Sequence, residues 1–176
     1  MARTRCTVER ATFTPFIVDG HRPYDFLADA EISIWLTRTY TDGTRERACL
    51  RLHIKRGYRT DGASTFWPVS LLLVPQWRDG DDAYNLAPVA HDILYLLAGV
   101  IESDYEAVHL SREEVDDILR GAWRCWGMSR FLAGCADKGV EIFAGGSGHW
   151  GNDSYHVREF VYAEWETTAL IPGAAA

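Results

Sequence analysis

The sequence ISIWLTRTYTDGTRERACLRLHI, residues 32–54, decides the fold class. Apolar residues alternate with polar or amphipathic ones over residues 32–36, and again over residues 48–54. Between the two runs lie Asp42 and Gly43, a pair typical of tight hairpin turns because glycine accepts a positive φ. The stretch therefore predicts two antiparallel strands with one buried face and one face in water.

Outward from this hairpin, residues 13–18 predict a further strand of the same sheet. His53 alternates with Cys49 and Arg51, which predicts a solvent-facing position for its side chain. We therefore expect residues 1–60 to form a small antiparallel sheet.

The second half of the chain has helical patterns. Residues 85–98 are largely apolar and predict a helix, in which Pro88 is tolerable only near the first turn. Ser111 and Glu114 form a capping box, which marks the start of a second helix. Gly127 is expected to end it. An apolar stripe at helical spacing lies between these ends, made of Val115, Ile118, Leu119 and Ala122.

Ser129 is expected to cap a third helix that runs toward Phe143, and a glycine-rich loop is predicted over residues 144–155. Residues 157–166 fit either a strand or a short helix. No repeat or linker divides the chain, so we expect one α+β domain, with a small N-terminal antiparallel sheet followed by a helical half packed on it. Its parts are a β-rich segment at 1–60, a helical segment at 61–143, and a glycine-rich loop with a C-terminal segment at 144–176.

Charge is unevenly distributed along the 176 residues. The chain holds 18 Lys and Arg against 25 Asp and Glu, a formal net charge of −7. Residues 1–60 hold 11 basic and 7 acidic groups, or +4, and residues 61–176 hold 7 and 18, or −11. An acidic chain is not expected to bind nucleic acid strongly, because counterion release requires a cationic surface. Acidic pairs such as Glu113 and Glu114 are expected to be solvated.

No membrane insertion and no signal peptide are expected. The longest apolar stretches fall short of the roughly 18–20 residues that span a bilayer, and no apolar region follows the basic N-terminus. The four cysteines have no CxxC spacing, so zinc-ribbon and dithiol redox functions lack support. Reduced, buried cysteines are the expectation, and the even number leaves disulfides open. The cysteines are Cys6, Cys49, Cys125 and Cys135.

Polar residues that can carry chemistry gather in three places: after the hairpin, within the apolar helix, and near the start of the capped helix. They are Thr60, Asp61 and Ser64; His91, Asp92 and Tyr95; and Arg112 and Asp116. At about 100° per residue, His91 and Tyr95 share one helix face, and Asp92 points about a quarter-turn away. A buried imidazole or carboxylate without a partner costs several kcal/mol, so these groups are expected to pair with one another.

Two interpretations of these residues remain open. In the catalytic one, His91 is a general base oriented by Asp61 or Asp116, and Ser64 is a nucleophile or a substrate contact. No cofactor is expected, although Asp61, His91, Asp92 and Asp116 could instead hold a divalent cation.

In the structural interpretation, the same groups form a hydrogen-bonded network that fixes the fold without catalysis. Thr60, Asp92, Tyr95 and Arg112 belong to that network in either case. Trp123 and Trp126, three residues apart on the capped helix, are expected to be core residues.

The chain resembles domain-of-unknown-function family 1353, which is found largely in phages and prophages. The resemblance covers residues 54–143 and rests on three motifs, Gly-x-x-Thr-Asp-x-x-Ser, His-Asp-x-Leu-Tyr and Ser-Arg-x-x-x-Asp. The family commonly has a proline two residues after the serine, whereas Phe66 stands there in this chain. The resemblance implies a phage-encoded or prophage-encoded α+β protein and brings no established reaction. The motif residues are Gly57, Thr60, Asp61 and Ser64; His91, Asp92, Leu94 and Tyr95; and Ser111, Arg112 and Asp116.

The His-Asp pair is also similar to those of two enzyme groups. HD-type phosphohydrolases are all-helical, and the β-rich first third of this chain argues against that fold. In secreted phospholipases A2, a helical His-Asp pair combines a base and a calcium ligand. Those enzymes depend on dense disulfides, which four scattered cysteines do not supply.

From the sequence we expect a structural or assembly component of a phage virion, in the tail or connector region. Its expected partners are other virion proteins or its own copies, and its expected location is the virion or the host cytoplasm. The alternative is a hydrolase of cell-wall peptide or a phosphoester that uses a His-Asp centre, with or without a metal ion. Whether the protein is an enzyme stays open at this level.

Overall fold

The predicted hairpin forms the centre of the fold, as strands β3 (Ala30–Thr39) and β4 (Arg45–Ile54). At the turn, the Asp42 carboxylate accepts a hydrogen bond from the backbone N–H of Thr44 at 2.8 Å. Gly43 has a φ of +84°, a conformation that glycine adopts without strain. The hairpin prediction is therefore confirmed in both its strands and its turn.

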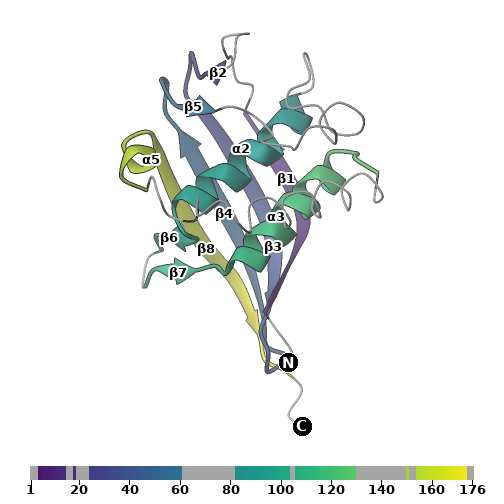
Figure 1. Ribbon diagram of the computed structural model, residues 1–176. Helices are drawn as coiled ribbons and strands as arrows, with labels where there is room; N and C mark the ends of the chain where they lie inside the picture. The colour runs from purple at the N-terminus through teal and green to yellow at the C-terminus, as the bar shows by residue number, and fades with distance from the viewer. Residues whose placement is uncertain are drawn as a thin grey trace.

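The structure is a computed structural model that describes most of the chain; the described residues are given at the end of this paragraph. A mainly antiparallel sheet and helices on one of its faces make up the described part, so the predicted α+β class is confirmed (Figure 1). No helix in that part has the length and apolar character needed to cross a bilayer. The predicted third helix toward Phe143 lies outside the described residues, as does most of the glycine-rich loop. The described residues are 4–14, 18, 24–60, 82–103, 106–129, 150 and 154–173.

Two more strands flank the hairpin, β1 (Arg5–Phe13) and β8 (Val161–Ile171), in the order β1-β3-β4-β8. The strand predicted to begin at Phe13 instead ends there, and Thr14 lies outside it; residues 15–17 of the predicted range lie outside the described residues. The position was missed because β1 is an edge strand in which only Cys6 and Ala11 are buried. Such a strand has no regular apolar alternation to detect.

The C-terminal strand β8 completes a sheet that the sequence predicted to be N-terminal. The sequence allowed a strand or a short helix over residues 157–166, and the structure contains both. Helix α5 (Ser154–Phe160) ends where β8 begins. The buried carboxylate of Glu46 on β4 accepts a hydrogen bond from the indole N–H of Trp165 on β8 at 2.9 Å. This bond ties the two strands together beyond their backbone pairing.

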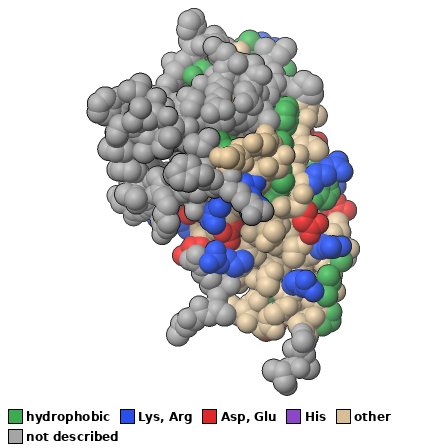
Figure 2. Space-filling view, turned by 90° about the vertical axis from the view of Figure 1, so that its right-hand side faces the viewer, with side chains coloured by type: hydrophobic (Ala, Val, Ile, Leu, Met, Phe, Trp, Pro, Cys, Tyr) green, Lys and Arg blue, Asp and Glu red, His purple; other side chains and the backbone are tan. Residues whose placement is uncertain are grey.

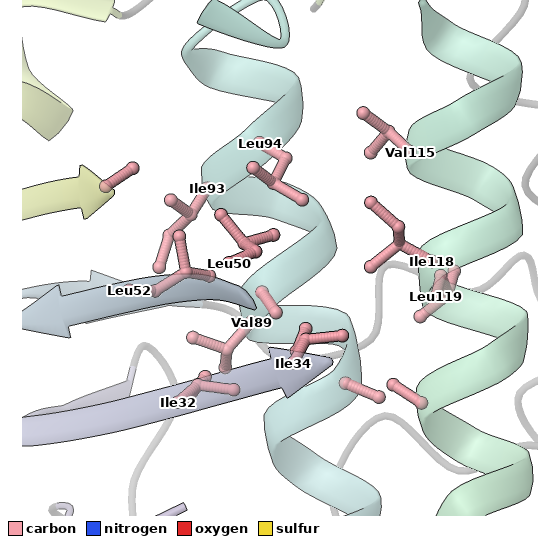
Figure 3. Packing of buried hydrophobic residues seen from close by; sticks show 14 of the residues in the cluster. Ile32, Ile34, Leu50, Leu52, Val89, Ile93, Leu94, Val115, Ile118 and Leu119 are labelled. Atoms are coloured by element: carbon pink, nitrogen blue, oxygen red, sulfur yellow. The ribbon is translucent and has the colours of Figure 1, made fainter. Parts of the chain in front are cut away.

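Helices α2 (Asp82–Leu96) and α3 (Arg112–Cys125) lie side by side over one face of the sheet (Figure 1). Because α2 begins three residues earlier than expected, Pro88 lies inside the helix and not in its first turn. The apolar sides of both helices meet the apolar face of the sheet, and the predicted stripe on α3 is buried there (Figure 3). The central core residues are Ile32, Ile34, Leu50, Leu52, Val89, Ile93, Leu94, Val115, Ile118 and Leu119.

A short hairpin, β6 (Val100–Ile101) and β7 (Val108–His109), reverses the chain between α2 and α3. Gly99 opens the reversal with a φ of +69°, and a Cβ built there would lie 2.2 Å from the carbonyl oxygen of Leu110. The reversal makes the two helices antiparallel. A second small pair consists of β2 (Tyr24–Asp25) and β5 (Arg59–Thr60).

The opposite face of the sheet is polar, as predicted. The His53 side chain is 39% exposed and lies 3.5 Å from a carboxylate oxygen of Glu164. Next to it, the Arg51 guanidinium pairs with Glu166 at 2.6 Å. Cys49 points to the same face and is nevertheless buried.

The described cysteines differ in exposure. Cys6 and Cys49 are free and buried, as predicted, whereas Cys125 is free and exposed. Burial raises the pKa of the Cys6 thiol, and the neighbouring Glu114 carboxylate raises it further, so this thiol stays protonated. Cys135 lies outside the described residues. No CxxC-type chemistry is available to the three described thiols.

The start of α3 has the predicted capping box. The Ser111 hydroxyl accepts from the backbone N–H of Glu114 at 3.3 Å, and the Glu114 carboxylate accepts from the backbone N–H of Ser111 at 2.7 Å. At the other end, Gly127 has a φ of +92° just after the C-cap, so the predicted end of the helix is also confirmed.

We expect Ser111→Ala to lower the free energy of unfolding by about 1 kcal/mol, because the substitution removes the acceptor for a helix N–H. Ser111→Thr keeps a hydroxyl and is expected to cost only a few tenths of a kcal/mol. Urea denaturation followed by circular dichroism measures both values. Equal stabilities for the two variants would contradict a stabilising role of the hydroxyl.

The expectation that Glu114 is solvated is wrong. Its side chain is 2% exposed and pairs with Arg38 of β3, with 2.7 Å between Nε and Oε1. The Arg38 guanidinium also donates to the backbone carbonyl of His109 at 2.8 Å. The capping carboxylate is therefore buried because an arginine from the sheet meets it, a contact that local sequence does not reveal.

Candidate functional site

The antiparallel pairing of α2 and α3 brings polar residues from both helices together. His91 and Tyr95 lie on the side of α2 that faces α3, and Arg112 and Asp116 lie on the facing side of α3. His91 contacts Asp116 and Tyr95 contacts Arg112, which is the order that antiparallel helices give. These positions are enclosed, and the His91 side chain is only 5% exposed.

Both ring nitrogens of His91 face carboxylates. Nε2 lies 3.0 Å from Oδ1 of Asp116, and Nδ1 lies 3.3 Å from Oδ1 of Asp92. A carboxylate accepts and cannot donate, so the pairing is fully satisfied only when both nitrogens carry a proton. Burial alone would lower the pKa of His91, but the hydrogen bonds to Asp116 and Asp92 outweigh burial and raise this pKa above its ordinary value. The geometry therefore favours an imidazolium held between two carboxylates.

A second tier of groups holds Asp116. The Tyr95 hydroxyl donates to the same Oδ1 of Asp116 at 3.2 Å, and Nε of Arg112 donates to the Tyr95 oxygen at 2.5 Å. Burial, followed by the Asp116 charge, raises the pKa of Tyr95, so the phenol keeps its proton. The result is a continuous chain of polar contacts from Arg112 through Tyr95, Asp116 and His91 to Asp92.

Ring contacts fix the orientation of these groups. The His91 and Tyr95 rings lie 4.3 Å apart, and the Arg112 guanidinium carbon lies 5.3 Å from the Tyr95 ring centre. The indole of Trp150 meets the Tyr95 ring edge-on, with 4.9 Å between centres and an interplanar angle of 83°. Sequence reasoning missed Trp150, because it assigned this segment only to a glycine-rich loop. The presence of a tryptophan in a glycine-rich segment was the one feature of the sequence that could have pointed to this contact.

One donor of the second tier lacks an acceptor within the described part of the chain. Nη2 of Arg112 is buried and has no hydrogen-bond partner among the described residues. A buried donor of a charged group that stays unpaired is costly, and in native proteins such groups usually mark a functional role or an unseen water or ion. The described residues of the second tier therefore do not satisfy all of the hydrogen-bond donors of Arg112.

The two carboxylates differ in their surroundings. The Asp116 side chain is 12% exposed and receives two hydrogen bonds, whereas the Asp92 side chain is 28% exposed and makes the longer contact with His91. Asp116 can therefore fix the ring through Nε2, and Nδ1 faces the more exposed of the two carboxylates. A ring held by a buried carboxylate at one nitrogen is also the arrangement found around general bases.

Not every predicted site residue can be placed. Asp61 and Ser64 lie outside the described residues, and Thr60 is buried at the end of β5, directly before them. Asp92 and Asp116 lie on opposite sides of the His91 ring, so the three side chains do not converge on one point. In the described part of the chain, no three His, Cys, Asp or Glu side chains surround a common position for a metal ion.

Fold and site together define an α+β protein with a histidine–carboxylate centre between two antiparallel helices. The family model described as "Protein of unknown function (DUF1353)" matches residues 38–139, more than half of the chain. The chain belongs to this family, and the resemblance inferred from its three motifs is confirmed. No curated protein and no solved structure matches the chain.

Proposed function

We propose that the protein is a hydrolase in which His91 activates a water molecule. The unequal pairing of the His91 ring carries this proposal, since Nε2 is held tightly by a buried carboxylate and Nδ1 makes a longer contact with a more exposed one. A histidine that only filled space in the core would not need two carboxylates, a tyrosine and an arginine arranged around it.

In the proposed reaction, the resting imidazolium first gives its Nδ1 proton to solvent, and water then replaces Asp92 at the neutral Nδ1 of His91. The water oxygen attacks an ester carbonyl, an amide carbonyl or a phosphoryl centre of the substrate, and its proton passes to Nδ1. Asp116 accepts the hydrogen bond from the Nε2–H group and stabilises the imidazolium that forms. The leaving group then takes the proton from Nδ1, and the base is restored.

A panel of substrates tests the proposal: p-nitrophenyl esters, bis-p-nitrophenyl phosphate, phospholipid vesicles and cell-wall muropeptides. Each is assayed with and without added Ca²⁺ or Mg²⁺, which also tests the cation predicted from the sequence. We expect turnover of at least one substrate, and a loss of about 100-fold or more in kcat for His91→Gln.

His53→Gln is the matched control, because His53 lies exposed on the opposite face of the sheet. It is expected to keep wild-type activity. If His91→Gln fails to fold, Asp116→Asn takes its place, since Asp116 stabilises the imidazolium in the proposed reaction. Turnover that survives both His91→Gln and Asp116→Asn would refute the assignment, as would no turnover of any substrate.

The full pairing of His91 also supports the second candidate, a component of a phage virion in which the network only locks α2 against α3. The split of charge along the chain suits contacts with other virion proteins or with further copies. Mass spectrometry of particles purified from the host that carries this sequence tests it. Absence of the protein from such particles would refute the virion role.

A further inference from the structure

A hollow lies on the side of α3 that is turned away from His91. It has a volume of about 610 Å³ and runs between residues 5–8 of β1 and the C-terminal half of α3. Asp116 faces α2, but its neighbour Asp117 faces β1, where it accepts a hydrogen bond from the backbone N–H of Cys6 at 3.2 Å. This bond satisfies one backbone donor on the free edge of β1.

Basic side chains outnumber acidic ones in the lining of this groove. Arg5, Arg120 and Arg124 contribute three positive charges and Asp117 one negative charge, so the groove carries +2 on a chain whose net charge is −7. Figure 2 faces the side of the molecule with β1 and α3, and shows Lys and Arg side chains interspersed with Asp and Glu on its described surface. A concentration of positive charge in a hollow raises the local concentration of anions.

The single carboxylate of the groove is already engaged. Asp117 pairs with Arg120 at 3.1 Å and with Arg5 at 3.5 Å, besides its bond to Cys6. Arg124 lies one helical turn beyond Arg120 on the same face and is exposed, and it forms no ion pair with the residues described. The groove therefore has more cationic donors than its own carboxylate can satisfy.

A glycine sets the distance between α3 and β1 beside the groove. A Cβ at Gly121 would lie 2.5 Å from a methyl carbon of Val8, so only glycine lets α3 approach β1 this closely. Val8 and Met128 add apolar surface to the lining.

We propose that this groove binds a small polyanion, whose phosphate or carboxylate groups pair with Arg5, Arg120 and Arg124. The planar guanidinium matches both kinds of anion with two parallel hydrogen bonds. The volume falls within the range of small-molecule sites, roughly 300–1,000 Å³. This binding site is separate from the His91 centre and does not depend on the proposed hydrolase activity.

Isothermal titration calorimetry at low salt, with inorganic pyrophosphate and with citrate as probes, tests the proposal on the full chain. We expect saturable binding, weakened about tenfold by Arg124→Gln and abolished by Arg124→Glu. Arg45→Glu is the matched control, because Arg45 is an exposed arginine of β4 outside the groove, and it is expected to bind as the wild type does.

Binding of pyrophosphate alone would identify a phosphate ligand, and binding of citrate alone a carboxylate ligand. Arg5→Gln is a second test within the groove and is also expected to weaken binding. If Arg5→Gln unfolds because Arg5 no longer pairs with Asp117, the Arg124 variants still test the proposal. The proposal is overturned if neither probe saturates the wild type below about 10 mM. It is also overturned if Arg124→Glu binds as tightly as Arg45→Glu.

Discussion

Glu114→Ala is expected to lower the free energy of unfolding by about 3 kcal/mol, because it leaves the Arg38 guanidinium enclosed without its carboxylate. The pair links β3 to the first turn of α3, so its loss loosens the helix from the sheet. The substitution also removes half of the capping box, since the Glu114 carboxylate accepts the Ser111 backbone N–H. Urea denaturation followed by circular dichroism measures the change.

Glu113→Ala is the matched control, a change of the same residue type one position earlier on the same helix. Glu113 is exposed, and its replacement is expected to cost about 0.5 kcal/mol or less. Glu114→Gln separates charge from shape, because it keeps a side-chain oxygen for the cap and removes the charge facing Arg38. Equal losses for Glu113→Ala and Glu114→Ala would show that the buried pair carries no stability.

Asp116→Asn is expected to reverse the pH dependence that His91 gives to stability. In the wild type, the pKa of His91 is raised above its unfolded value of about 6.5. The resulting stabilisation is fully present below pH 6.5 or so and is lost as the pH rises through the folded pKa of His91. In Asp116→Asn the stronger partner is neutral, so burial prevails and lowers the pKa of His91. The variant is then expected to lose stability as the pH falls below about 6.5.

NMR titration of the histidine ring protons measures the pKa directly, with His91→Gln to assign the signal. Denaturation over a pH series measures the matching change in unfolding free energy. Asp117→Asn is the control, since Asp117 contacts Arg5 and Arg120 and is not hydrogen-bonded to His91. An unchanged pKa of His91 in Asp116→Asn would contradict the pairing described for the site.

Local patterns predicted the parts of the fold that depend on neighbouring residues. The alternation and turn of the β3–β4 hairpin, and the cap of α3 at Ser111, each lie within one stretch of sequence. The edge strand β1 and the buried state of Glu114 were predicted wrongly, because both depend on contacts with distant segments. Arg38 and Glu114 are 76 residues apart, and nothing in either neighbourhood indicates the other.

The candidate site was predictable to a similar degree. Helical spacing placed His91 and Tyr95 on one face, and the structure shows that this face meets Asp116 and Arg112. Which carboxylate lies at which ring nitrogen depends on the angle between two helices, so sequence alone could not decide it. The edge-on contact of Trp150 with Tyr95 could not be predicted either, because Trp150 lies on neither helix and is distant from Tyr95 in the sequence.

The pairing of β4 with β8 has a consequence for how the chain folds during synthesis. Ile54 and Val161, opposite each other in the sheet, are more than 100 residues apart in sequence. On the ribosome, β4 is translated long before its second neighbour and keeps an unpaired edge next to Leu50 and Leu52 until the last strand emerges. The nascent protein thus passes through a stage with an open, apolar-backed sheet edge, and chaperone protection is most valuable at that stage.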